Sequence, residues 1–229
     1  MTLLHHQKTI GIITILSGIL AAACIIAGMI AVNYNSDAFS DPMLILTIPN
    51  VNAGAARWSM IFDMLGYYLL LAPVIYLLHG WLKTKTPWSN LITCSGVGYV
   101  LIGGIGAAIL AVVWPYILQT YPTAAPDLQL ILKTNFGFFN DMVYKGLWNL
   151  LEMFFVGTWW LWVGVIFYKN KFTYTGLLSI VLGTAGLADG VAGIFQLNAL
   201  HEITLNVYLI LAIIWAVCIG VFLLRKPLK

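Results

Sequence analysis

Charged residues are scarce in this chain. Lys, Arg, Asp and Glu together make up 8% of its 229 residues, whereas hydrophobic residues make up 61%. An ordinary soluble domain carries roughly 25% charged residues. The shortage of charge therefore excludes an ordinary soluble domain, and the composition fits an integral membrane protein.

Several kinds of functional site are also missing. The formal charge is only +3 and no basic stripe is interleaved with aromatic residues, so nothing predicts a nucleic-acid partner. Cys24, Cys94 and Cys218 lie in separate apolar segments, which excludes a disulfide framework or a thiolate cluster. The four histidines are too dispersed for haem or di-iron ligands, and no nucleophile elbow is present. We expect no cofactor.

Six apolar segments are long enough to cross a membrane, which takes about 20 consecutive apolar residues. They cover approximately residues 10–32, 58–82, 91–118, 143–168, 174–197 and 204–224. The sequence predicts an all-α polytopic membrane protein, a single transmembrane domain over residues 1–229 arranged as three hairpins. Two long connections, 33–57 and 119–142, lie on the outer side, where apolar residues suit either a lid or simple loop packing.

The N-terminal segment resembles the start of a cleaved lipoprotein signal. Lys8 precedes an apolar run that contains Ala21-Ala22-Ala23-Cys24. The run continues through Val32, which is long for a signal peptide and suitable for a span. We expect this segment to be the first membrane helix.

The basic residues predict the orientation, because positively charged loops are retained in the cytoplasm. One side carries Lys8, Lys83, Lys85, Lys169, Lys171, Arg225, Lys226 and Lys229. The other side carries only Arg57, Lys133 and Lys145. Both termini are therefore predicted to be cytoplasmic.

Several short motifs carry a family resemblance. They are the helix start from Arg57 to Asp63, the sequence Gly146-Leu147-Trp148 and the aromatic run into residues 164–171. With the six spans, they resemble a family of bacterial six-helix membrane proteins, domain-of-unknown-function 4386. The resemblance implies a location in the bacterial inner membrane and implies no activity.

Three acidic residues, Asp63, Glu152 and Asp189, interrupt three different apolar segments. With a helix rise of about 1.5 Å per residue, all three lie roughly 8 to 12 Å inside the predicted outer boundary. A carboxylate at that depth costs a few kcal/mol or more unless it is paired, protonated or wetted, so such residues are treated as functional candidates. We expect the three to share one polar layer.

The helical spacing predicts companions for these acids. Residues three, four and seven apart share a helix face, which places Tyr67 with Asp63, Lys145 and Asn149 with Glu152, and Gln196 with Asp189. We expect Lys145 and Arg57 to set the charge of the acids. His201 and Glu202 are weak candidates for metal ligands. Pro73 is expected to kink the second helix below Asp63.

Three interpretations remain open. In the first, the acids line a polar pocket in the outer half that binds or transports a small cationic or polar ligand or protons. In the second, the same groups form a structural network in an assembly protein, because buried acids need partners whether or not they bind anything. In the third, the carboxylates serve a membrane-embedded hydrolase or transferase. The lipid bilayer is the one partner that the composition itself predicts.

Overall fold

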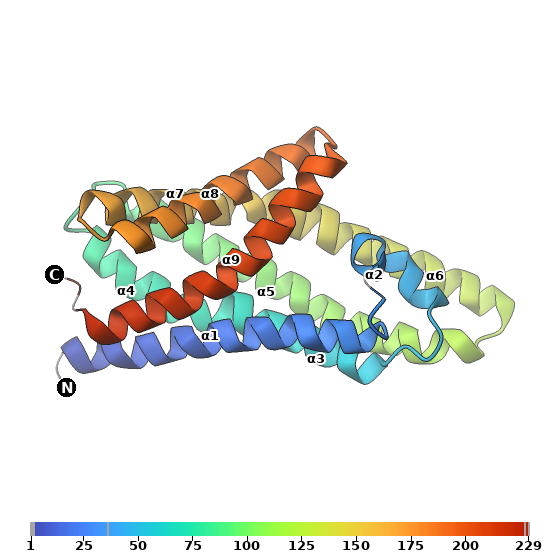
Figure 1. Ribbon diagram of the computed structural model, residues 1–229. Coiled ribbons are helices and arrows are strands. Elements are labelled where there is room, and N and C mark those ends of the chain that lie inside the picture. Colours follow the sequence, from blue (N-terminus) through green and yellow to red (C-terminus); the bar gives the residue numbers. More distant parts are fainter. Residues whose placement is uncertain (1–2, 36, 227, 229) are drawn as a thin grey trace.

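The computed structural model describes residues 3–35, 37–226 and 228, and within these residues every regular element is a helix. Figure 1 shows the helices aligned along one long axis. The order is α1 (Leu3–Ala31), α2 (Asp37–Ser40), η1 (Pro42–Thr47), α3 (Ala53–Asp63), η2 (Met64–Tyr68), η3 (Leu69–Leu71), α4 (Ala72–Leu82) and α5 (Ser89–Thr120). It continues with η4 (Tyr121–Thr123), α6 (Pro126–Asn140), η5 (Asp141–Glu152), α7 (Met153–Lys169), α8 (Thr173–Ile194) and α9 (Asn198–Arg225).

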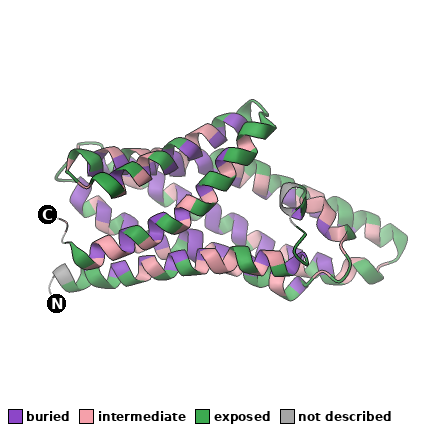
Figure 2. Cartoon of the chain, viewed as in Figure 1, coloured by how far each residue is buried: buried purple, intermediate pink, exposed green. Residues whose placement is uncertain are grey.

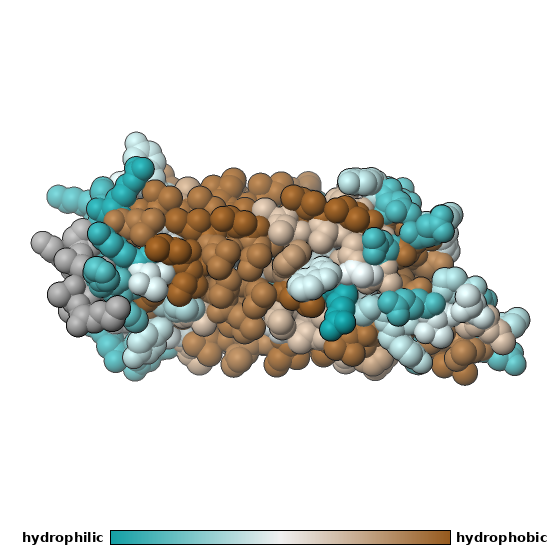
Figure 3. All heavy atoms as spheres, turned by 90° about the horizontal axis from the view of Figure 1, so that it is seen from below, coloured by the Kyte–Doolittle hydropathy of each residue, from teal (hydrophilic) through white to brown (hydrophobic). Residues whose placement is uncertain are grey.

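Six helical stretches are long and apolar enough to cross a membrane, which confirms the predicted all-α, six-span fold. They are His5–Ala31, Ala53–Leu82, Ser89–Thr123, Pro126–Lys169, Thr173–Ile194 and Asn198–Arg225. Figure 2 shows buried and exposed stripes alternating around each helix. Figure 3 shows a hydrophobic surface across the middle of the molecule and hydrophilic residues toward its two ends. Exposed apolar side chains such as Ile12 and Val112 therefore suit contact with lipid.

The second span changes its helical pitch in the middle. The α-helix α3 ends at Asp63, the π-helical turn η2 follows, and the 3-10 turn η3 leads into α4. Pro73 is in the first turn of α4, where its missing backbone N–H costs nothing. The helix type therefore changes between Asp63 and Pro73, and the kink expected at Pro73 stays a prediction.

The fourth span is longer than predicted. Residues 126–140 belong to α6 and continue without a break through η5 into α7, so most of the predicted outer loop 119–142 is helical. Trp114 and Phe136 pack their rings against each other at 6.0 Å, which fixes α6 on the end of α5. Of the apolar residues in this segment, Leu132 and Phe136 are buried, whereas Leu128, Leu130, Ile131 and Phe138 are exposed. The other predicted outer loop, 33–57, holds the short helices α2 and η1.

Glycines allow close contact between neighbouring spans. A Cβ on Gly11 of α1 would lie 2.9 Å from the carbonyl oxygen of Gly220 on α9. A Cβ on Gly157 of α7 would lie 2.7 Å from the backbone nitrogen of Leu187 on α8. In lipid, helices associate through such close packing, because the hydrophobic effect does not drive apolar helices together in an apolar solvent.

One end of the bundle gathers both termini and the connections α4–α5 and α7–α8 (Figure 1). Phe172 follows α7 and packs against Trp81 of α4 and Phe222 of α9, with ring centroids 6.1 and 5.0 Å apart. The Gln7 side chain donates to the carbonyl oxygens of Leu223 and Lys226 at 2.8 and 2.7 Å. These contacts therefore join α1, α4 and α9 with the connection between α7 and α8.

Gly66 provides a test of this packing. A Cβ at Gly66 would collide with the backbone of Leu20 and Ala21 in α1. Overpacking of this kind costs roughly 1–3 kcal/mol. We expect Gly66→Ala to lower the thermal unfolding temperature in detergent.

Gly80→Ala is the matched control, because Gly80 has no atom within 4 Å of an added Cβ. An exposed helical Gly→Ala change stabilises by roughly 0.5–1 kcal/mol. Equal unfolding temperatures for the two variants would contradict the close contact between α1 and η2.

Candidate functional site

The three predicted acids are all buried, and each belongs to a different hydrogen-bonded cluster. Asp63 ends α3, Glu152 ends η5, and Asp189 lies within α8. Their exposed fractions are 8%, 1% and 0%. Glu152 interacts electrostatically with both other acids, Asp63 and Asp189.

Glu152 is held by two phenols from two other spans. The Tyr68 hydroxyl donates to Oε1 and Oε2 of Glu152, at 3.3 and 3.1 Å. The Tyr208 hydroxyl lies 3.2 Å from Oε1. Among the described residues, no Lys, Arg or His forms an ion pair with this carboxyl group.

A chain of hydroxyls extends from Glu152 to Tyr99. The Tyr208 hydroxyl lies 3.4 Å from the Tyr99 hydroxyl, and Tyr99 donates to the backbone carbonyl of Tyr67. Because a phenol carries one hydrogen, Tyr208 donates either to Glu152 or to Tyr99. With a carboxylate, Tyr208 donates to Glu152. With a carboxylic acid, Glu152 donates to Tyr208, which then donates to Tyr99.

Aromatic rings surround this chain of hydroxyls. Trp160 packs against both Tyr99 and Tyr208 at 5.7 Å, and against Trp215 at 5.4 Å. Trp160 and Trp215 are completely buried. The apolar rings isolate the polar groups from lipid and strengthen each hydrogen bond by lowering the local dielectric.

The π-helical turns explain why the sequence did not reveal Tyr68. An α-helical spacing of four pairs Asp63 with Tyr67, whose hydroxyl instead donates to the Leu209 carbonyl at 3.2 Å. The π-helix η2 has hydrogen bonds spaced by five residues, and it buries Tyr67 and Tyr68 together. Sequence reasoning also missed Tyr99 and Tyr208, and the only available signal was a tyrosine inside each of two apolar spans.

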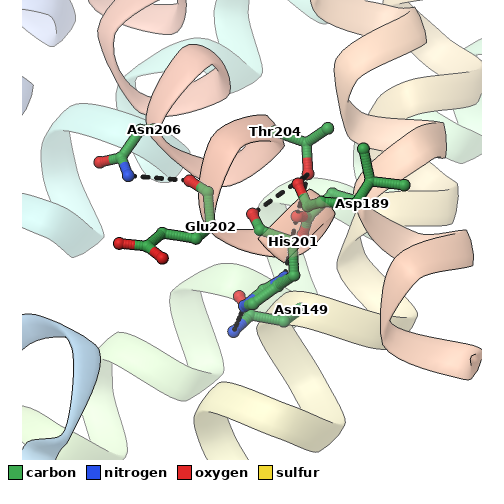
Figure 4. A network of polar contacts seen from close by, with 7 residues as sticks. Asn149, Asp189, His201, Glu202, Thr204 and Asn206 are labelled. Carbon is green, nitrogen blue, oxygen red and sulfur yellow. Dashed lines mark hydrogen bonds and ion pairs between the residues drawn. The ribbon is translucent and has the colours of Figure 1, made fainter. Parts of the chain in front are cut away.

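Asp189 forms a second cluster, shown in Figure 4. Its Oδ1 atom accepts from Nδ1 of His201 at 2.9 Å and from the Thr204 hydroxyl at 2.6 Å. The Asn149 side-chain nitrogen lies 3.2 Å from Nε2 of His201. The Oδ2 atom of Asp189 is buried and has no hydrogen-bond partner among the described residues.

Asp63 forms a third and poorer cluster. The Cys24 thiol donates to its Oδ1 atom at 3.9 Å, and the Ser59 hydroxyl donates to the Cys24 carbonyl at 3.0 Å. The Oδ2 atom is buried and lacks a partner within the described part of the chain. Asp63 therefore has weak hydrogen bonding for a buried acid.

A small cavity of about 30 Å³ lies beside Ser59 and Met60. Its lining is mostly apolar: Gly28, Ala31, Val32, Ala38, Ile45, Val51, Ala56, Ser59, Met60, Trp114 and Tyr144. Ala38 and Ile45 come from α2 and η1, so the connection between α1 and α3 forms part of the cavity wall. Its volume is about that of one water molecule.

Two predicted basic companions do not reach the acids. Lys145 pairs with Asp141 at 2.7 Å, and the side chains of this pair are 74% and 63% exposed. The wider π-helical turn of η5 moves Lys145 away from the face of Glu152, whereas an α-helix would align residues seven apart. Arg57 is exposed and has no ion pair to any residue that the structure describes. The prediction that these cations neutralise the carboxylates is wrong.

Two further predicted residues also lie outside the clusters. Asn149 contacts His201, and Tyr67 takes part only through its backbone carbonyl, which accepts from Tyr99. Gln196 is exposed and has a positive φ of 53° just after α8 ends, so it does not continue the face of Asp189. Glu202 is exposed and points away from Asp189 and His201 (Figure 4). Over residues 3–35, 37–226 and 228, no three His, Cys, Asp or Glu side chains gather as metal ligands would.

The family described as Domain of unknown function (DUF4386) matches residues 16–227, and the chain belongs to this family. The family resemblance of the sequence is therefore confirmed. No curated protein and no solved structure is significantly similar to the chain.

The two phenols on Glu152 give a testable contribution to stability. Tyr68→Phe and Tyr208→Phe each keep the ring and remove a donor to a buried carboxyl group, at a cost of roughly 1–3 kcal/mol. We expect both variants to unfold at lower temperature in detergent. We also expect the double variant to lose less than the sum of the two, because both act on Glu152.

Tyr76→Phe is the control, because Tyr76 is 74% exposed. Its unfolding temperature should match that of the parent protein. Additive effects of the first two changes would argue against a shared acceptor.

Proposed function

We propose that this member of the DUF4386 family binds protons in the interior of the membrane and conducts or exchanges them with the outer side. Glu152 is the central group in this proposal, with Asp189 and Asp63 as further protonatable sites. The observation that carries the proposal is the set of hydroxyl groups around Glu152. They offer hydrogen-bond partners to both the charged and the neutral form of this carboxyl group.

The lack of a cationic partner supports a proton as the bound species. An ionised carboxylate inside a membrane protein needs a cation, or it costs several kcal/mol. Glu152 has phenols instead of Lys or Arg among its described neighbours. A proton removes the charge without requiring any additional space.

The size of the cavity near Ser59 also favours a small species. A volume of about 30 Å³ suits one water molecule, whereas ligand pockets measure roughly 300–1,000 Å³. This difference argues against an organic substrate in this cavity. Asp63 does not line the cavity, but Ser59, one helical turn before it, does.

A structural brace is the second candidate function. The hydrogen bonds of Glu152 join η5 to η2 and to α9, three separate spans. Such bonds would hold the bundle together even if no proton were exchanged. The brace and the proton site differ in their response to a change that removes only the acidity.

We also propose that the protein is a bacterial inner-membrane protein with both termini in the cytoplasm. Seven basic residues of the described chain lie at the end where α1 begins and α9 ends: Lys8, Lys83, Lys85, Lys169, Lys171, Arg225 and Lys226. No acidic residue belongs to that end, since Asp37, Asp41, Asp127, Asp141 and Glu202 lie toward the other. This asymmetry follows the rule that basic loops stay in the cytoplasm.

Glu152→Gln separates proton binding from bracing. The amide keeps the shape and can still accept from Tyr68, but it does not titrate. In liposomes with a pH-sensitive dye inside, we expect the parent protein to carry protons down an imposed pH gradient. We expect Glu152→Gln to reduce this flux to the level of protein-free liposomes while the protein remains folded.

Glu202→Gln is the matched control, because it removes an exposed acid from the same half of the protein. It should keep the parent flux. Parental flux in Glu152→Gln, combined with a lower unfolding temperature, would favour the brace.

The orientation is tested by chemical labelling. In a background without Cys24, Cys94 and Cys218, we expect Lys133→Cys to react with a membrane-impermeant maleimide in intact cells. Lys85→Cys should react only after permeabilisation. Both parent side chains are exposed, so burial does not explain a difference. The reverse pattern would invert the proposed topology.

A further inference from the structure

The Asp189 cluster differs from the Glu152 cluster in its access to the surface. The His201 side chain is 28% exposed, whereas the Asp189 side chain is fully buried. The imidazole ring of His201, with Nδ1 on the carboxyl group and part of the side chain exposed, therefore connects buried Asp189 to the exterior. His201 lies in the first turn of α9, close to the α8–α9 connection at the outer end.

The hydrogen-bond partners of His201 favour one position for the ring proton. In this orientation of its amide, Asn149 presents its side-chain nitrogen, which is only a donor, so Nε2 of His201 accepts from it. Nδ1 therefore carries the hydrogen and donates to Asp189. In this arrangement the acceptor nitrogen of the neutral ring, Nε2, faces the Asn149 side chain, which is itself partly exposed.

The same site also accommodates the charged ring. A rotation of the Asn149 amide by half a turn brings its oxygen to Nε2, which can then carry a second hydrogen and donate. The positive ring would lie 2.9 Å from Oδ1 of Asp189 and form a salt bridge with it. The change requires no backbone movement.

Other titratable groups around His201 are few. Lys145 and Asp141 lie on η5 before Asn149 and pair with each other in an exposed position. Glu202 on α9 points away (Figure 4). Glu152, further along η5, is buried and within electrostatic range of Asp189. Asp189 is therefore the acidic group that contacts His201 directly.

We propose that His201 is the port through which protons from the outer side reach Asp189. This inference rests on the proposed function and extends it by naming the access residue. A hydronium ion or buffer acid transfers one proton to Nε2, and the Asn149 amide rotates to accept the new N–H. The ring then releases its other proton from Nδ1 to Oδ1 of Asp189. One proton enters, one leaves the ring, and Asp189 becomes neutral.

The buried Oδ2 atom of Asp189 is consistent with this acceptor role. It has no partner in the described part of the chain, which is costly for a carboxylate. Protonation removes the charge that this unpartnered oxygen helps to carry. The Thr204 hydroxyl also lies 2.8 Å from the Leu200 carbonyl, so it has an alternative acceptor when Asp189 is neutral.

The test compares proton uptake by His201→Ala with uptake by the parent protein in liposomes. We expect uptake from the outer side to slow at least about tenfold, equivalent to about 1.4 kcal/mol of barrier. Added imidazole should restore much of the rate, because the ring position is partly open to solvent. If His201→Ala slowed proton uptake only by damaging the structure, added imidazole would not restore the rate.

His79→Ala is the matched control, because His79 bonds to Thr93 near the opposite end of the bundle. It should retain the parent rate and show no response to imidazole. Parental uptake in His201→Ala, with uptake abolished in Glu152→Gln, would overturn the port and leave the proposed function intact. Slow uptake in His201→Ala without imidazole rescue would also overturn the port.

A second measurement does not depend on flux. In ¹⁵N-histidine NMR spectra, the signals lost in His201→Ala identify this ring. We expect the neutral ring to carry its hydrogen on Nδ1, and Asn149→Ala to weaken that preference. A hydrogen on Nε2 in the parent protein would overturn the port even if Glu152 proved essential. If Glu152→Gln kept full flux, the proposed function would fail. The NMR measurement rejects the port separately, by finding the ring hydrogen on Nε2.

Discussion

The hydrogen bonds between Glu152 and the phenols of Tyr68 and Tyr208 connect three spans at the centre of the protein. In lipid a buried acid has no water to solvate it, so its partners must come from neighbouring helices. This requirement fixes the relative rotation of η5, η2 and α9. The surrounding rings of Trp160 and Trp215 then close the cluster against lipid.

Changes in helix type place two of the three acids. Asp63 is the last residue before one π-helical segment, and Glu152 is the last residue of another. A π-helical turn rotates side chains relative to an α-helix, and such turns frequently occur at functional sites. Here the turns bury Tyr67 and Tyr68 side by side and expose Lys145. Glu152 thereby receives hydroxyl partners in place of a cation.

The clusters around Glu152 and Asp189 share one physical property. Each contains a group whose hydrogen-bonding direction can reverse without backbone movement: the Tyr208 hydroxyl in one and the Asn149 amide in the other. A buried site that must remain folded in two charge states needs such a group, because an unsatisfied buried polar atom costs roughly 1–3 kcal/mol. Asp63 has fewer hydrogen bonds, and its Oδ2 atom has no partner within the described part of the chain.

The sequence by itself determined the fold class and the burial of the acids. Six apolar runs dictate six spans because the membrane requires continuous hydrophobic helices, and Asp63, Glu152 and Asp189 interrupt these runs irrespective of how the helices pack. Only the tertiary structure decided the partners. Lys145 and Gln196 were assigned by α-helical spacing, which fails where η5 widens the turn and where α8 ends. Tyr99, Tyr208 and Thr204 come from other parts of the chain, and distance along the sequence does not reveal contacts between spans.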